Sequence, residues 1–144
     1  MGKVIVVDDD ADMRAVMMEA LEVAGHEVFS ASNGREGVEY ALAIQPDLII
    51  VDLFMPVQEG LVTIRQLRQQ LPNLPILAIS GRHMASSPML TVALQLGAVN
   101  VLEKPFEPMT LRAAVEASLE TLPHRKPPEV LANQGAEPVL PEND

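Results

Sequence analysis

The sequence predicts an α/β protein in which five parallel strands form one doubly wound sheet with helices on both faces. Short apolar runs without polar alternation recur along the chain, as is typical of strands that are buried on both faces. Each run is followed by a segment with apolar residues at three- and four-residue spacing, which predicts an amphipathic helix. The chain has 144 residues, 48% of them hydrophobic, and is long enough for one domain with a sizeable core.

The first two strand and helix pairs span residues 4–45. Residues 4–7 are apolar and mostly β-branched, and the helix after them ends at Gly25. One stripe of that helix is apolar: Met13, Val16, Met17, Ala20, Leu21 and Ala24. Residues 28–31 predict the second strand, and Asn33 can cap a helix that ends before Pro46. The buried stripe of this second helix is expected to include Val38, Ala41 and Leu42.

The last three pairs follow the same rule. Residues 48–51, 76–79 and 99–102 predict strands, and a fourth helix should run from Pro88 to Leu96 before Gly97. Pro72 breaks the third helix, and Pro108 opens the last one. The apolar stripes of these two helices are Leu61, Ile64, Leu67 and Leu71, and then Leu111, Val115, Leu119 and Leu122.

The folded domain is expected to cover residues 1–122. Residues 123–144 contain five prolines and no periodic apolar stripe, which predicts a disordered tail. A net charge of -10 opposes direct binding to nucleic acid or to an anionic membrane. The chain has no cysteine, and its first apolar run is too short for a signal peptide or a spanning helix, so we expect a cytoplasmic protein.

Polar side chains stand at the carboxyl ends of the predicted strands, where open parallel sheets bind ligands. These residues are Asp8 and Asp9 after the first strand, Asp52 after the third, Ser80 after the fourth and Lys104 after the fifth. Clustered carboxylates raise one another's pKa values unless a cation neutralises them, and oxygen ligands with room for water favour Mg²⁺. The serine hydroxyl and the lysine ammonium could then bind a phosphoryl group carried by one carboxylate. Asp10 is explained by helix capping alone.

The segments VIVVDDD, LIIVDLFMP, AIS and EKPF match, in order and in separation, the landmark segments of a known family. On these segments, residues 1–122 resemble the receiver domain of two-component response regulators. The resemblance implies a flavodoxin-like fold with strand order 2-1-3-4-5. It makes Asp52 the phosphoacceptor and Pro105 the second residue of a cis peptide bond. It also implies a Mg²⁺ site made by Asp8, Asp9, Asp52 and the backbone carbonyl of Phe54, with Ser80 and Lys104 binding the phosphoryl group.

The function implied by the resemblance is a signalling switch rather than an enzyme. A histidine kinase or phosphotransfer protein would phosphorylate Asp52, and with no effector domain after the receiver the signal would pass to a partner protein. The family's usual switch aromatic is replaced by Val101. Phe54 and Arg82 are placed at the mouth of the site, where they should slow the loss of the phosphoryl group.

The fourth helix is apolar on nearly all sides. We therefore expect it, with the fifth strand and the last helix, to form the surface for a partner or for a homodimer formed on phosphorylation.

A small Mg²⁺-dependent hydrolase with an aspartyl-phosphate intermediate is the alternative, because it needs the same acids, cation and lysine. Such an enzyme would want a second acid two residues after Asp52, and Phe54 stands there. The scattered histidines His26, His83 and His124 make zinc binding improbable, and they are expected to be solvated, as are Arg65 and Arg68.

Overall fold

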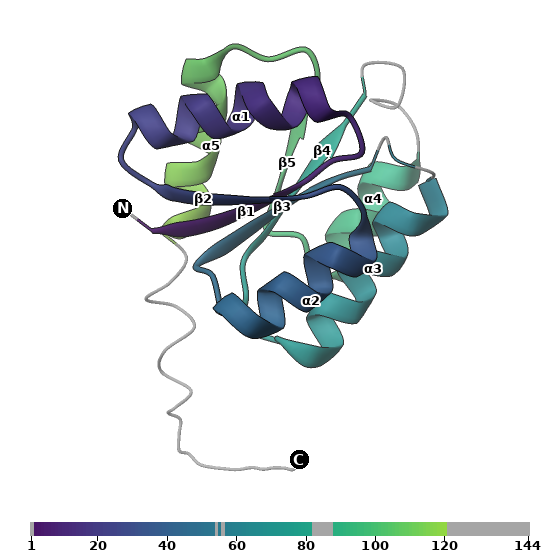
Figure 1. The fold of residues 1–144 in the computed structure, drawn as a ribbon. Helices are drawn as coiled ribbons and strands as arrows, with labels where there is room; N and C mark the ends of the chain where they lie inside the picture. Colours follow the sequence, from purple (N-terminus) through teal and green to yellow (C-terminus); the bar gives the residue numbers. More distant parts are fainter. Residues whose placement is uncertain (1, 54, 56, 82–87, 121–144) are drawn as a thin grey trace.

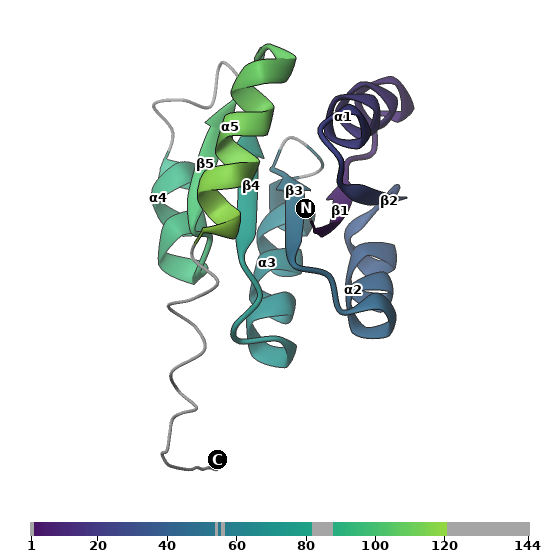
Figure 2. The same cartoon turned by 90° about the vertical axis from the view of Figure 1, so that its left-hand side faces the viewer.

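Five parallel strands form a single sheet with helices on both sides, as Figures 1 and 2 show. The structure is a computed structural model that describes residues 2–53, 55, 57–81 and 88–120. The strand order is β2-β1-β3-β4-β5, as predicted. The strands are β1 (Lys3–Val7), β2 (Glu27–Ala31), β3 (Leu48–Asp52), β4 (Ile76–Ser80) and β5 (Asn100–Glu103). The helices are α1 (Ala11–Val23), α2 (Gly34–Ile44), α3 (Val57–Gln70), α4 (Pro88–Leu96) and α5 (Pro108–Leu119).

The core lies in two layers, one on each face of the sheet. Side chains of the inner strands alternate between the layers, because successive residues of a strand point to opposite faces. Ile5 and Ile49 pack with α2, α3 and α4, whereas Val6 and Ile50 pack with α1 and α5. All of β3 and β4 is buried, which explains why their sequences show no polar alternation.

The predicted helix ends are confirmed for α4, which runs from Pro88 to Leu96, and for the start of α5 at Pro108, and local backbone interactions explain the ends of α1 and α2. The Asp10 side chain accepts hydrogen bonds from the amides of Asp12 and Met13, and Asn33 caps α2 in the same way through the amide of Glu36. Gly25 follows α1 with a φ of 102°, a conformation in which a residue with a Cβ is strained.

Among the described residues of the predicted apolar stripes, two are exposed. Val16 of α1 is 53% exposed and Leu42 of α2 is 41% exposed. Both lie at the margin of a stripe whose central residues, such as Met17 and Ala41, are fully buried. The buried stripe of each helix is therefore narrower than the predicted one. Leu122, the proposed domain boundary beside it and the tail at 123–144 lie outside the described residues.

His26 is buried rather than solvated. It follows the turn after α1, and its Nδ1 accepts a hydrogen bond of 3.1 Å from the amide of Gly2 at the start of β1. Its Nε2 lies 3.7 Å from the Glu116 carboxylate on α5. The prediction was wrong because the turn packs between the sheet and α5, which the local sequence does not show.

Arg68 is also wrongly predicted as solvated, whereas Arg65 is exposed as expected. The Arg68 guanidinium donates hydrogen bonds to the backbone carbonyls of Pro72 (2.6 Å) and Gly97 (2.8 Å). These carbonyls follow α3 and α4, whose last carbonyls have no partner inside the helix. Arg68 therefore joins the carboxyl ends of two neighbouring helices.

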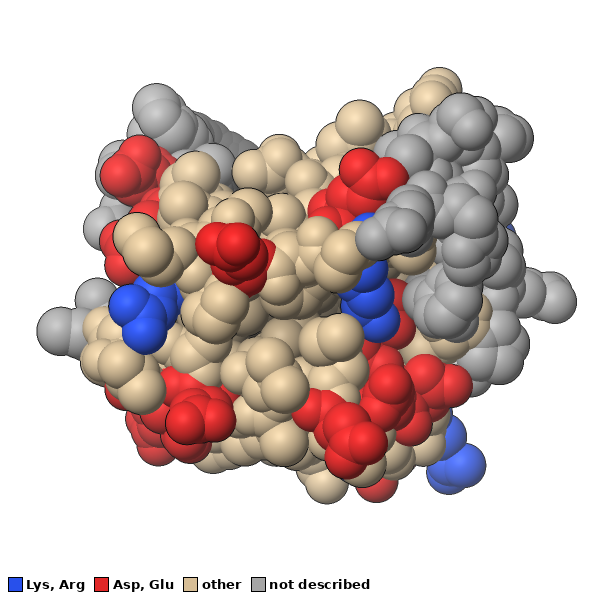
Figure 3. All heavy atoms as spheres, turned by 90° about the horizontal axis from the view of Figure 1, so that it is seen from above, with Lys and Arg blue, Asp and Glu red and all other residues tan. Residues whose placement is uncertain are grey.

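Among the described residues, no helix has both the length and the apolar character needed to cross a membrane. Figure 3 views the molecule from above, from the side of α1 and α5, and acidic side chains predominate over basic ones on this surface. Such a face repels polyanions, in keeping with the net charge of -10.

Candidate functional site

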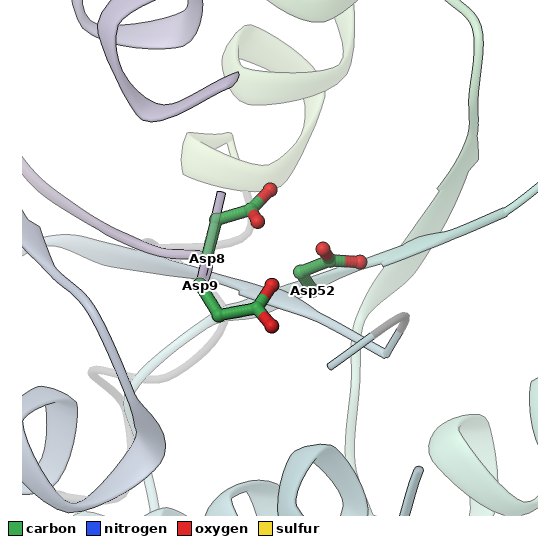
Figure 4. A group of neighbouring side chains, drawn as sticks. All are labelled: Asp8, Asp9 and Asp52. Atoms are coloured by element: carbon green, nitrogen blue, oxygen red, sulfur yellow. The ribbon is translucent and has the colours of Figure 1, made fainter. Parts of the chain in front are cut away.

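Asp8, Asp9 and Asp52 converge at the carboxyl edge of the sheet (Figure 4). The central strands β1 and β3 are parallel neighbours, with Val7 opposite Val51, so the segments that follow these two strands leave the sheet at the same place. One carboxylate oxygen from each of the three aspartates lies within 4.8 Å of the others. The predicted cluster is thus present in the fold, and its all-oxygen donor set fits Mg²⁺.

The three carboxylates differ in burial. Asp8 is fully buried and Asp52 is 1% exposed, whereas Asp9 is exposed. Burial raises the pKa of Asp8 from 3.8 to about 6, and the nearby charge of Asp52 adds to this rise, although the amide of Asp10 and the charge of Lys104 oppose it. The site therefore concentrates negative charge where water cannot screen it, and positive charge there is stabilising.

Lys104 supplies one positive charge from the loop after β5. Its ammonium lies 2.9 Å from Oδ2 of Asp52 and 3.3 Å from Oδ2 of Asp8. Burial opposes the charge on Lys104, but the hydrogen bond and charge of Asp52 and the charge of Asp8 outweigh it, so its pKa lies above its ordinary value. The peptide bond from Lys104 to Pro105 is cis, and the Lys104 amide donates to the Ser80 carbonyl at 2.7 Å.

Ser80 ends β4, the strand next to β3, where Ile79 lies opposite Asp52. The side chain is fully buried, and its Oγ has no hydrogen-bond partner within the part of the chain that is described. A buried hydroxyl without a partner is costly, and most such groups in proteins are satisfied. The hydroxyl is therefore available to donate to a group bound at the strand ends.

The loop from β1 to α1 is held by hydrogen bonds at successive residues. The Asp8 amide donates to the Ala31 carbonyl at 3.2 Å, and Oδ1 of Asp8 accepts from the Asp10 amide at 2.9 Å. The Asp8 carbonyl accepts from Nη1 of Arg14 at 2.7 Å. Sequence reasoning missed Arg14, because a single arginine in the first turn of a helix carries no pattern that reveals a backbone contact.

Of the remaining predicted site residues, the structure describes Val101. Val101 is half-buried on β5 and packs against the core layer beneath α2, α3 and α4. Phe54, expected both as a backbone ligand and at the mouth of the site, lies outside the described residues, and so does Arg82.

Comparison with known proteins identifies the family. A model of the response regulator receiver domain matches residues 4–116. The chain is 37% identical over 110 residues to the chemotaxis protein CheY of Thermotoga maritima, covering 75% of this chain and 90% of CheY. It is 36% identical over 117 residues to the alkaline phosphatase synthesis transcriptional regulatory protein PhoP of Bacillus subtilis, covering 81% of this chain and 48% of PhoP.

A solved structure gives the same result. The chemotaxis protein CheY4 of Vibrio cholerae is 33% identical and superposes with a TM-score of 0.76 over 82% of this chain and 98% of CheY4. The chain therefore belongs to the response regulator receiver domain family and takes part in two-component signalling. It spans about half the length of PhoP, so the activity of the whole of PhoP is not carried over to this chain.

Proposed function

We propose that the protein is a phosphorylation-activated switch in which Asp52 accepts a phosphoryl group in the presence of Mg²⁺. The observation that carries this proposal is the convergence of Asp8, Asp9 and Asp52 at the carboxyl edge of the sheet, with the Lys104 ammonium 2.9 Å from Asp52. The phosphoryl donor would be a histidine kinase or a phosphotransfer protein. Residues 1–122 would be sufficient for this chemistry. The protein would carry it out in the cytoplasm.

Asp8, Asp9, Asp52 and the backbone carbonyl of Phe54 would hold the metal ion. When bound, Mg²⁺ would offset the negative charge of the carboxylates and of the incoming phosphoryl oxygens, which otherwise repel each other. The raised pKa of Asp8, caused by burial and increased by the charge of Asp52, supports this assignment because a cation would relieve the same repulsion.

Asp52 would act as the nucleophile. One of its carboxylate oxygens would form a bond to phosphorus while the phosphorus–nitrogen bond of a phosphohistidine breaks, and the departing imidazole keeps the electron pair and takes up a proton. Lys104 already donates hydrogen bonds to the carboxylates of Asp8 and Asp52 and would bind the phosphoryl oxygens. The Ser80 hydroxyl, which has no hydrogen-bond partner among the described residues, would donate a hydrogen bond to one of these oxygens.

The signal would leave through α4, β5 and α5. Among the described residues, three large apolar side chains on or beside these elements are well exposed: Leu94 (50%), Val99 (42%) and Met109 (75%). Exposed apolar side chains on these elements favour a protein partner or a homodimer formed on phosphorylation. The net charge of -10 opposes direct binding to nucleic acid or an anionic membrane.

Incubation with acetyl phosphate and Mg²⁺, followed by intact mass spectrometry, tests the proposal. We expect the mass of one phosphoryl group on the wild-type protein and none on Asp52→Asn, which keeps the size of the side chain. Phosphate release is measured in the same samples. An adduct on the variant would overturn the assignment of Asp52, and rapid repeated turnover of an added phosphoester would favour the hydrolase instead.

A further inference from the structure

Asp9 differs from the other two aspartates of the cluster in how its side chain is held. Asp8 and Asp52 are buried and bound by the Lys104 ammonium, whereas Asp9 is exposed. Within the described residues, no hydrogen bond or ion pair fixes the Asp9 carboxylate. Its position in the cluster therefore depends on the backbone that carries it.

That backbone is held on both sides of Asp9. The peptide bond from Asp8 to Asp9 is planar, so a contact to the Asp8 carbonyl also orients the amide and Cα of Asp9. Nη1 of Arg14 donates to this carbonyl at 2.7 Å. On the other side, the Asp10 amide donates to Oδ1 of Asp8 at 2.9 Å. Arg14 is thus the external side chain that orients the peptide preceding Asp9.

Arg14 is itself held by its position in α1 and by its contact with the Asp8 carbonyl. It is half-buried in the first turn of α1, where its amide donates to the Asp10 carbonyl at 3.0 Å. The pKa of Glu36, at the start of α2, is lowered by hydrogen bonds from the amide and hydroxyl of Ser32, and the charge of Arg14 adds to the effect. The guanidinium is therefore anchored by the Asp8 carbonyl, and its charge is also felt by Glu36.

We propose that Arg14 is a positioning residue for the metal site: by holding the Asp8 carbonyl, it keeps the Asp9 carboxylate directed at the cation. This inference rests on the proposed function. The positive charge of Arg14 has the opposite effect on Mg²⁺ binding, because it repels a cation at the nearby cluster. Removal of Arg14 therefore weakens Mg²⁺ binding if positioning dominates and strengthens it if charge repulsion dominates.

Titration of the full chain with Mg²⁺, followed by amide NMR shifts, separates these effects. In Arg14→Met, we expect the Mg²⁺ dissociation constant to rise about tenfold, the lower range for residues that orient metal ligands. Arg35→Met is the matched control, since it removes the same charge from an exposed arginine that pairs with Glu39 on α2. The control should bind Mg²⁺ like the wild type. In Arg14→Lys, the side chain keeps its charge and N–H donors but loses the planar guanidinium, so we expect an intermediate loss.

Equal or tighter Mg²⁺ binding by Arg14→Met would overturn the inference while leaving the phosphoacceptor intact. Absence of Mg²⁺ binding by the wild type would overturn the proposed function itself. The rate of Asp52 phosphorylation is a second measurement. In Arg14→Met, the Mg²⁺ concentration that gives the half-maximal phosphorylation rate should rise about tenfold. The phosphorylation rate at saturating Mg²⁺ should stay within about twofold of the wild type. A lower saturating rate with unchanged Mg²⁺ dependence would also contradict a positioning role.

Discussion

Asp8 is a fully buried carboxylate with a second carboxylate beside it. Burial and the charge of Asp52 raise its pKa from 3.8 to about 6, so the folded protein binds this proton more tightly than the unfolded chain does. Between these two values the folded state holds more protons, and the free energy of unfolding falls as the pH rises. The ionised site is thus a source of instability that a bound cation or partner would reduce.

Asp8→Asn should therefore stabilise the metal-free protein at neutral pH. The gain in unfolding free energy should be small near pH 4, grow up to about pH 6 and level off above pH 7, reaching about 1–3 kcal/mol because one pKa unit corresponds to roughly 1.4 kcal/mol. Urea unfolding in EDTA across this pH range measures the difference. A difference that does not change with pH would show that ionisation of Asp8 does not destabilise the fold.

At the scale of single elements, the sequence predicted the strands and helices well because their patterns are local. A strand buried on both faces needs an unbroken apolar run, and a helix on a sheet needs one apolar stripe. Stripe margins were less predictable: Leu42 fits the spacing but remains 41% exposed, because α2 turns this edge to solvent. Contacts between distant segments, such as Arg68 with Gly97, leave no local pattern at all.

The elements α4, β5 and α5 should carry partner binding. Leu94→Glu places a charge at an exposed position of α4. We expect it to weaken capture of a phosphorylation-dependent partner by about tenfold or more, as the loss of a central apolar contact does at protein interfaces. Phosphorylated bait protein would be used on a lysate, with unphosphorylated protein as reference. Leu42→Glu is the matched control, because it changes a leucine of similar exposure on α2.

Capture of the same proteins by the wild type and by Leu94→Glu, in equal amounts, would contradict this placement of the interface. Loss of capture by Leu42→Glu alone would point to α2 instead. Thermal unfolding of both variants shows whether either substitution disturbs the fold.

For the whole molecule, the parallel topology explains why the site was predictable. Every strand ends at the same edge, so the residues after strands meet there whatever their separation in the sequence. Asp8 and Lys104, 96 positions apart, form an ion pair for this reason. The contacts of His26, Arg14 and Arg68 could not be predicted in the same way, because they depend on how helices and turns pack rather than on the order of strands.

The central claim is that this edge directs phosphorylation to Asp52 and not to the aspartates beside it. Protein phosphorylated with acetyl phosphate would be reduced with borohydride, which converts a phosphorylated aspartate to homoserine, and then mapped by peptide mass spectrometry. We expect homoserine at position 52, formed with Mg²⁺ and nearly absent in EDTA. Homoserine at position 8 or 9, or equal labelling without Mg²⁺, would contradict it.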